Sequence, residues 1–250
     1  RHLWRFGTVE RLDWETEYGT PAFGHLVLPP DHAPGRPLPL VVVGYLSQGF
    51  LRGGVGDEYP IHAFAARGYA VLSYNRPRTW GAERSWPDRE SAGRARTENW
   101  IDRRNVQSAL EVGVRLLRDR GLIAEGRLGL TGFSEGSTAL EWALVNSDLF
   151  SAYSASVCCY GPTTVMGGIV GISVSERFAP YGYPRTNENG AEFWRPISIE
   201  LNAERITAPL LIQAGDGEYI GALPGFTRLR DLGRPVDMYV ARNISNWPRE

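Results

Sequence analysis

Short apolar runs with almost no polar alternation are the feature that most restricts the fold of this chain. They cover residues 38–45, 69–74, 127–131, 152–158, 209–214 and 236–240. A strand that is apolar on both faces is typical of a parallel sheet with helices above and below, because both of its faces are then buried. These runs therefore predict a central sheet that is mostly parallel.

Helical patterns separate the apolar runs, at residues 58–67, 99–119, 136–146 and 223–232. In the second pattern an apolar stripe recurs at helical spacing, formed by Val106, Leu110, Val114 and Leu117. Strands that alternate with helices predict an α/β fold, with a doubly wound sheet covered on both faces.

Four further stretches fall outside this repeat. Residues 5–18 and 23–28 predict two antiparallel strands that precede the parallel sheet. Residues 75–96, rich in Arg, Trp and Pro, and residues 160–200, rich in Gly, Pro and aromatics, predict long irregular loops. Such loops in a compact domain are usually functional or mobile.

Length and charge restrict the class of protein. We expect residues 1–250 to form one catalytic domain, since 42% hydrophobic residues are enough for a continuous core. With 27 basic and 28 acidic side chains the net charge is -1, which provides no positive surface for nucleic acid or an anionic membrane. The longest apolar run, 38–46, is far shorter than the roughly 20 residues of a membrane span.

The only two cysteines, Cys158 and Cys159, are adjacent in the sequence. Neighbouring cysteines cannot join distant parts of a chain as a secreted disulfide framework does, so a reducing compartment and a cytoplasmic location are expected. Buried thiols of this kind usually fill space as small apolar groups. A metal site would need further ligands that the sequence does not supply nearby, and we expect neither a metal nor a cofactor.

The segment Gly132-Phe133-Ser134-Glu135-Gly136 lies between the run 127–131 and the helical pattern that begins at 136. A nucleophilic serine in the α/β-hydrolase fold occupies such a strand-to-helix turn, and glycines flank it because Cβ atoms there would collide with the helix and the strand. A five-residue pattern can arise by chance in a glycine-rich loop, but this context favours function. Ser134 is therefore the candidate nucleophile.

Acyl transfer also needs hydrogen-bond donors for the developing oxyanion. The backbone N–H of Glu135, at the start of a helix, is one candidate. The loop 44–50, which begins at the end of the run 38–45, offers the Tyr45 hydroxyl as the other. A packed aromatic at the end of a strand would fit that position equally well.

The acid that orients the catalytic base is expected after the penultimate strand, where the chain reads Ala214-Gly215-Asp216-Gly217-Glu218. Asp216 is the candidate, with Glu218 in reserve. The alternative is a turn or helix-capping aspartate, a common use of Asp beside Gly.

The base itself is missing from its expected place. In the catalytic triad of this fold the serine, the acid and the histidine follow one another along the chain, so a histidine is expected after Asp216. The sequence has four histidines, and all of them precede Ser134: His2, His25, His32 and His62. We expect these four to be ordinary surface or strand residues. Three explanations fit this pattern. We favour a sequence that is cut short before the base, because a closing helix is missing too. The alternatives are that another residue replaces the histidine, for which Asn246 is the candidate position, or that the protein is a pseudoenzyme.

Other side chains have both a functional and a structural interpretation. Arg52, Arg76 and Arg78 could clamp a substrate carboxylate, although solvated loop arginines are the favoured alternative. The segment 160–200 could rim a peptide-binding pocket above Ser134 or pack as a lid. Its aromatic residues are Phe178, Tyr181, Tyr183, Phe193 and Trp194.

Several segments carry a resemblance to a known family. They are residues 49–60 (GFLRGGVGDEYP), 68–77, the serine turn 132–136 (GFSEG, called the elbow below) with 137–144 (STALEWAL), Cys158-Cys159, and 210–216 (LLIQAGD). Through them the chain resembles the catalytic domain of the prolyl oligopeptidase family of serine peptidases, and within it the lasso peptide isopeptidases of proteobacteria.

The resemblance implies Ser134 as nucleophile, Asp216 as triad acid and Tyr45 as oxyanion donor. It implies hydrolysis, through an acyl-enzyme, of the amide that joins a peptide's N-terminal amine to an Asp or Glu side chain in a threaded lasso peptide. The sequence departs from the family in lacking the histidine and an N-terminal β-propeller. A carboxylic-ester hydrolase and a peptide-binding pseudoenzyme remain alternatives, because the same triad serves esters and binding outlasts the loss of a base.

Overall fold

The computed structural model describes residues 6–45, 60–156, 174–185, 190–215 and 218–241. Within these residues one sheet has the strand order β1-β2-β4-β3-β5-β6-β7-β8. The pairs β1–β2 and β2–β4 are antiparallel, and every later pair is parallel. The strands are β1 (Val9–Glu15), β2 (Pro21–Val27), β3 (Leu38–Tyr45), β4 (Ala70–Asn75), β5 (Ile123–Phe133), β6 (Ala152–Ser156), β7 (Leu210–Gly215) and β8 (Val236–Ala241).

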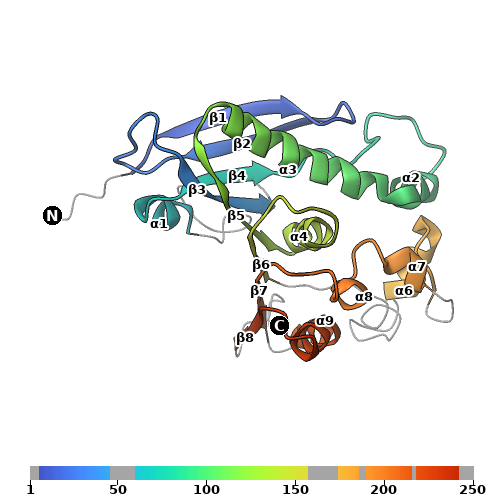
Figure 1. Cartoon of the computed structure of the whole chain (residues 1–250). Coiled ribbons are helices and arrows are strands. Elements are labelled where there is room, and N and C mark those ends of the chain that lie inside the picture. Colours follow the sequence, from blue (N-terminus) through green and yellow to red (C-terminus); the bar gives the residue numbers. More distant parts are fainter. Residues whose placement is uncertain (1–5, 46–59, 157–173, 186–189, 216–217, 242–250) are drawn as a thin grey trace, which may run out of the picture.

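Helices connect the strands (Figure 1). They are α1 (Ile61–Ala66), α2 (Arg89–Thr97), α3 (Ile101–Asp119), α4 (Glu135–Asn146), α6 (Val174–Phe178), α7 (Ala191–Trp194), α8 (Ile199–Asn202) and α9 (Tyr219–Asp231), with 3₁₀ turns at Glu98–Trp100 and Ala179–Tyr181. The alternation confirms the predicted α/β-hydrolase-like class, a mostly parallel sheet with helices on both faces. No helix in the described ranges combines the length and the apolar character needed to cross a bilayer.

The larger core lies between the sheet and α3, α4 and α9, which Figure 1 shows along one side of the strands. The predicted stripe of α3 is part of it, since Val106, Leu110, Val114 and Leu117 are each at most 2% exposed. Burial of four such side chains stabilises α3 against the sheet far more than helix propensity does.

A smaller core lies on the other face of the sheet. There Val43 and Val71 pack with Ile61 and Ala65 of α1. Successive residues of a strand point to opposite faces, so a strand apolar on both faces serves both cores at once. This explains why β3 and β4 have no polar alternation.

The prediction of irregular structure at 75–96 is wrong in part, because α2 occupies its end. The Asp88 side chain accepts the Ser91 N–H at 2.6 Å and caps this helix. Only Ala92 of α2 is buried, so the apolar periodicity that reveals a helix in a sequence is absent. The stretch 160–200 similarly contains the short helices α6, α7 and α8.

Candidate active site

Ser134 is the single residue between the end of β5 and the start of α4. Its backbone has φ 53° and ψ -115°, a conformation that side-chain-bearing residues rarely adopt, and its side chain is exposed. Its N–H donates to the Ser156 carbonyl of β6 at 3.1 Å. The predicted sharp, strained turn is therefore present, and it lifts Ser134 above the carboxyl end of the sheet.

Gly132 allows this turn to close. A Cβ atom at this position would lie 2.3 Å from the carbonyl oxygen of Gly136, inside the contact distance of any two such atoms. The predicted clash between a side chain here and the helix is thus confirmed for Gly132. Only glycine lets β5 and the first turn of α4 approach so closely.

Ser137 braces the same turn from inside α4. Its buried hydroxyl lies 2.8 Å from the Gly132 carbonyl and 2.5 Å from the Ser156 carbonyl, between which it shares its one hydrogen. The oxygen also accepts the Ser156 N–H at 3.1 Å. Sequence reasoning missed this role, and the only signal was a serine one position beyond the five-residue motif.

We expect the variant Ser134→Gly to be more stable than the parent protein by about 1 kcal/mol. Glycine adopts the backbone angles of this turn without the penalty that a Cβ atom imposes, which is typically about 1–3 kcal/mol for such a residue. Urea denaturation measures the difference. Equal or lower stability of the glycine variant would show that the turn is not strained.

The Glu135 backbone remains the first candidate oxyanion donor. Glu135 is the first residue of α4, where an N–H has no acceptor within the helix. For Tyr45 the structure describes the backbone alone. In the parallel register of β3 and β5, Gly44 is level with Gly132, so Tyr45 ends its strand at the same edge as the elbow. Its role as the second donor stays a prediction.

The candidate acid comes directly after a strand of the same parallel sheet. Asp216 lies outside the described residues, immediately after the last residue of β7, which is separated from β5 by β6 alone. Glu218, the reserve candidate, accepts the Gly215 N–H with Oε2 at 3.2 Å. The triad role of Asp216 stays a prediction.

None of the described histidines is in β5 or α4, and His32 lies in the turn between β2 and β3. His25 is in β2, and β4 and β3 separate that strand from β5, a distance of roughly 14 Å at ordinary strand spacing. His62 is in α1. Burial lowers the pKa of the His25 and His62 imidazoles, which favours their neutral forms. His2 and Asn246 lie outside the described residues.

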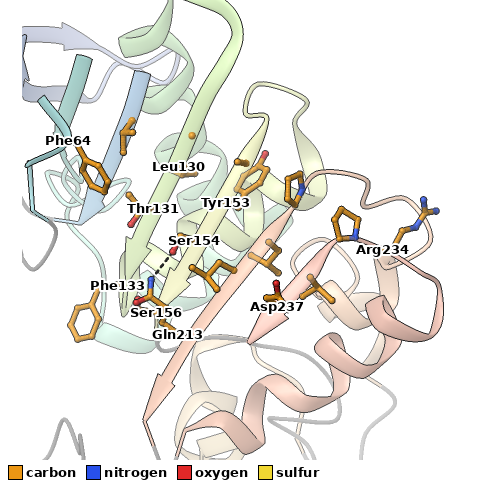
Figure 2. A pocket seen from close by; sticks show the side chains of 18 of the residues that line it. Phe64, Leu130, Thr131, Phe133, Tyr153, Ser154, Ser156, Gln213, Arg234 and Asp237 are labelled. Carbon is orange, nitrogen blue, oxygen red and sulfur yellow. Dashed lines mark hydrogen bonds between the residues drawn. The ribbon is translucent and has the colours of Figure 1, made fainter. Parts of the chain in front are cut away.

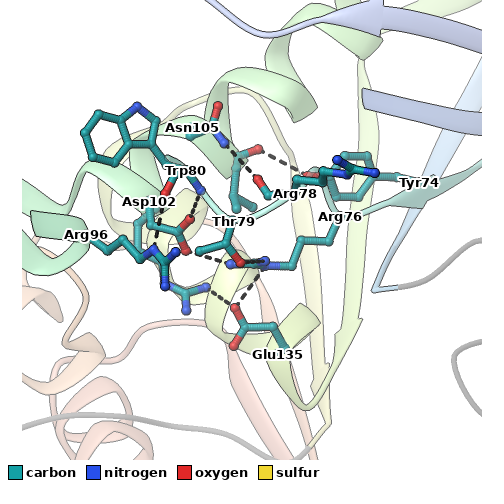
Figure 3. Close-up of polar contacts among 11 residues, drawn as sticks. Tyr74, Arg76, Arg78, Thr79, Trp80, Arg96, Asp102, Asn105 and Glu135 are labelled. Carbon is teal, nitrogen blue, oxygen red and sulfur yellow. Dashed lines mark hydrogen bonds and ion pairs between the residues drawn. The ribbon is translucent and has the colours of Figure 1, made fainter. Parts of the chain in front are cut away.

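Four charged side chains form a network around the first residue of α4 (Figure 3). They are Arg76, Asp102, Arg103 and Glu135. Arg103 of α3 donates to Glu135 Oε1 at 2.5 Å, and Arg76 Nε lies 3.2 Å from the same oxygen. Arg76 Nη2 also donates to Asp102 Oδ2 at 2.6 Å. The prediction that these arginines are solvated loop residues is therefore wrong for Arg76. Arg78 is exposed, as that prediction expects.

The aromatic residues of the segment 160–200 pack rather than line an open pocket where the structure describes them. Trp194 is 3% exposed and joins Trp100 and Trp142 in a buried cluster, against which Tyr183 and Phe193 pack. The indole Nε1 of Trp100 donates to the Phe193 carbonyl at 3.1 Å. The packing alternative is thus the correct one for Trp194. Phe178 stays 41% exposed.

A hollow with a volume of 1010 Å³ lies on the sheet face opposite α4 (Figure 2). Thr131, Ser154 and Gln213 contribute to its wall, and Gln213 Nε2 donates to Ser154 Oγ at 2.9 Å.

In the described ranges no three His, Cys, Asp or Glu side chains come close enough to hold a metal ion. Arg52 and the two cysteines lie outside the described residues.

Comparison with known proteins identifies relatives of the whole chain. Residues 59–243 match the prolyl oligopeptidase family. The lasso peptide isopeptidase AtxE2 of Asticcacaulis excentricus is 41% identical over 242 residues, which are 96% of this chain and 34% of AtxE2. The chain thus spans about a third of the length of this curated relative.

Solved structures agree with the sequence comparison. A serine-to-alanine variant of AtxE2 with Astexin3-dC4 bound superposes with a TM-score of 0.90 at 40% identity, covering 96% of this chain and 37% of that one. An acylaminoacyl peptidase from Pyrococcus horikoshii has a TM-score of 0.66 at 18% identity, over 95% and 37% of the two chains, and supports the fold alone. From its fold and its sequence, the chain belongs to the prolyl oligopeptidase family.

Proposed function

We propose that residues 1–250 form the hydrolase domain of a serine isopeptidase that opens lasso peptides. The observation that carries the proposal is Ser134, exposed on a strained turn at the carboxyl edge of a parallel sheet in a chain of this family. The 41% identity to a lasso peptide isopeptidase supports the substrate class. We also propose a cytoplasmic location, on the strength of the adjacent cysteines.

In this proposal Ser134 Oγ attacks the side-chain carbonyl carbon of the ring-closing amide. The Glu135 N–H and the Tyr45 hydroxyl stabilise the oxyanion of the tetrahedral intermediate. The C–N bond then breaks, the peptide's N-terminal amine leaves with a proton, and the Asp or Glu side chain of the peptide stays esterified to Ser134. Water hydrolyses this ester and releases a free carboxylate.

The serine hydroxyl needs a base to lose its proton at neutral pH. Asp216 would orient that base, but residues 1–250 contain no histidine after Ser134. Removing a triad member typically lowers turnover by roughly 10⁴ to 10⁶. The proposal therefore assigns the nucleophile, the acid and the oxyanion donors, and leaves the base unassigned.

The test compares the chain with a version lengthened by a histidine-bearing C-terminal segment from a family member. Each is incubated with a threaded lasso peptide, with a linear peptide of the same sequence, and with an activated carboxylic ester. Mass spectrometry follows the gain of one water. We expect the lengthened version to open the ring of the lasso peptide and to leave the linear peptide intact.

Three results would contradict the proposal. Cleavage of the ester with no ring opening would indicate a carboxylic-ester hydrolase. Cuts in the linear peptide at backbone bonds would indicate an ordinary peptidase. Tight binding of the lasso peptide without cleavage by either version would indicate a peptide-binding pseudoenzyme.

A further inference from the structure

Glu135 follows the candidate nucleophile in the sequence, and its carboxylate lies toward the Arg76 guanidinium (Figure 3). Its Oε1 atom contacts two arginines, Arg103 at 2.5 Å and Arg76 at 3.2 Å. Arg103 comes from the first turn of α3, and Arg76 directly follows β4. One carboxylate at the elbow thus joins three separate elements of the fold.

A second carboxylate closes the arrangement. Asp102 accepts Arg76 Nη2 at 2.6 Å with one oxygen and the Trp80 N–H at 2.7 Å with the other. Arg76 therefore cannot move away from Glu135 without breaking its ion pair with Asp102. Asp102 and Arg103 are neighbours in α3, so both ends of the network are anchored in one turn of helix.

The backbone before α3 is bent in a way that places this turn. Asn99 and Trp100 have positive φ values of 49° and 56°, which non-glycine residues seldom adopt. Arg104 Nε donates to the Asn99 carbonyl at 2.9 Å, and Trp100 is anchored in the aromatic cluster. Strained residues that the surrounding structure holds in place often support functional sites.

The charges of the network balance and are largely buried. The side chains of Asp102 and Arg103 are 12% and 14% exposed, that of Arg76 20%, and that of Glu135 32%. Burial acts to lower the pKa of Arg103, but the Glu135 and Asp102 carboxylates outweigh it and raise that pKa. Arg103 therefore stays charged, and its contact with Glu135 is not weakened by solvent as a surface pair is.

We propose that Arg103 and Arg76 are positioning residues for acyl transfer, which hold Glu135 so that its backbone N–H keeps the orientation an oxyanion donor needs. This inference rests on the proposed function. A donor contributes to catalysis only when it is aimed at the oxyanion before the reaction starts. Two ionic contacts on the side chain of the same residue restrict the rotation of its backbone.

The variant Arg103→Met removes the shorter contact and keeps an unbranched side chain that resembles the aliphatic part of arginine. In the histidine-bearing version we expect the maximal rate of Ser134 phosphonylation by a fluorophosphonate to fall by roughly 10- to 100-fold, since small displacements of an oxyanion donor have effects of this size. The reagent concentration at half-maximal rate should change little. Arg120→Met is the matched control, because Arg120 of the same helix region makes an exposed ion pair with Glu10 at 2.7 Å.

The double variant Arg103→Met/Glu135→Met separates positioning from charge balance. It removes one charge of each sign and leaves the Arg76–Asp102 pair intact, so its stability should return towards that of the parent protein. Its rate should stay low, because nothing then holds the side chain at position 135. Recovery of the rate together with the stability would overturn the inference in favour of a purely structural role.

Hydrogen exchange of residues 135–140 gives a readout that needs no activity. We expect the Ser137 and Thr138 amides, which donate to the Ser134 carbonyl, to exchange faster in Arg103→Met and at the parent rate in Arg120→Met. If the fluorophosphonate never labels Ser134 in the histidine-bearing version without further substitutions, the proposed function fails. The hydrogen-exchange rates then still test the positioning role of Arg103. Unchanged exchange in Arg103→Met would refute it, whatever the labelling shows.

Discussion

Replacing Ser134 by alanine is expected to lower hydrolytic turnover by roughly 10⁴- to 10⁶-fold in a version of the protein that carries its base. The loss is large because no other group replaces the attacking oxygen, so the acyl-enzyme cannot form. Steady-state hydrolysis of a lasso peptide, the proposed substrate, measures it. The exposed Ser134 side chain contributes little to packing, so stability should change by no more than about 0.5 kcal/mol.

Ser151→Ala is the control for this variant. Ser151 also carries a hydroxyl on the protein surface, which donates to the Gly126 carbonyl at 2.6 Å, at the opposite end of β5 from the elbow. Its loss should leave turnover unchanged. Turnover by Ser134→Ala close to that of Ser151→Ala would mean that another residue is the nucleophile.

Replacing Gly132 by alanine is expected to destabilise the protein by at least about 2 kcal/mol and to abolish Ser134 reactivity as well. The added Cβ atom would meet the Gly136 carbonyl oxygen at 2.3 Å and its carbon at 2.4 Å. Both are backbone atoms of α4, so relief requires the helix to move away from β5. Urea denaturation measures the change in the free energy of unfolding.

Gly129→Ala is the matched comparison for this second variant. Gly129 lies in the same strand, but a Cβ atom there would come no closer than 3.8 Å to a neighbouring atom. Alanine should therefore be tolerated at 129, and a small gain in stability is expected from the stiffer unfolded chain. Equal effects of the two substitutions would show that the close approach at the elbow is not what Gly132 provides.

The fold could be predicted because its signals are local in the sequence. A strand buried on both faces is largely apolar, as residues 38–45 are and as residues 70–75 are apart from Ser73 and Asn75. Helix α3 repeats its buried residues at helical spacing. The elbow was visible for the same reason, since strand, serine, glycines and helix follow one another without interruption. Helix α2 was missed because it buries only Ala92.

The network behind the elbow could not be predicted, because it depends on contacts between distant positions. Arg76, Asp102 and Glu135 are far apart in the sequence, and each is an ordinary charged residue in its own segment. They come together where the first turns of α3 and α4 lie beside the end of β4. The paired backbone strain at Asn99 and Trp100 likewise has no sequence signal such as a glycine.

The aromatic residues of the segment 160–200 show a related limit. Composition suggested either a peptide pocket or a packed lid, and the choice depended on partners elsewhere in the chain. Trp194 packs against Trp100, with ring centroids 6.1 Å apart, and Trp100 also lies 5.9 Å from Trp142. These partners come from the start of α3 and from α4, which no pattern within residues 160–200 could indicate.

Covalent labelling shows whether Ser134 is an acyl-transfer nucleophile. The histidine-bearing version is treated with a fluorophosphonate, digested, and searched by mass spectrometry for the modified residue, with Ser134→Ala treated in parallel. We expect one phosphonyl group on Ser134 and none in the alanine variant. Adducts on another serine, or equal labelling of both proteins, would contradict it.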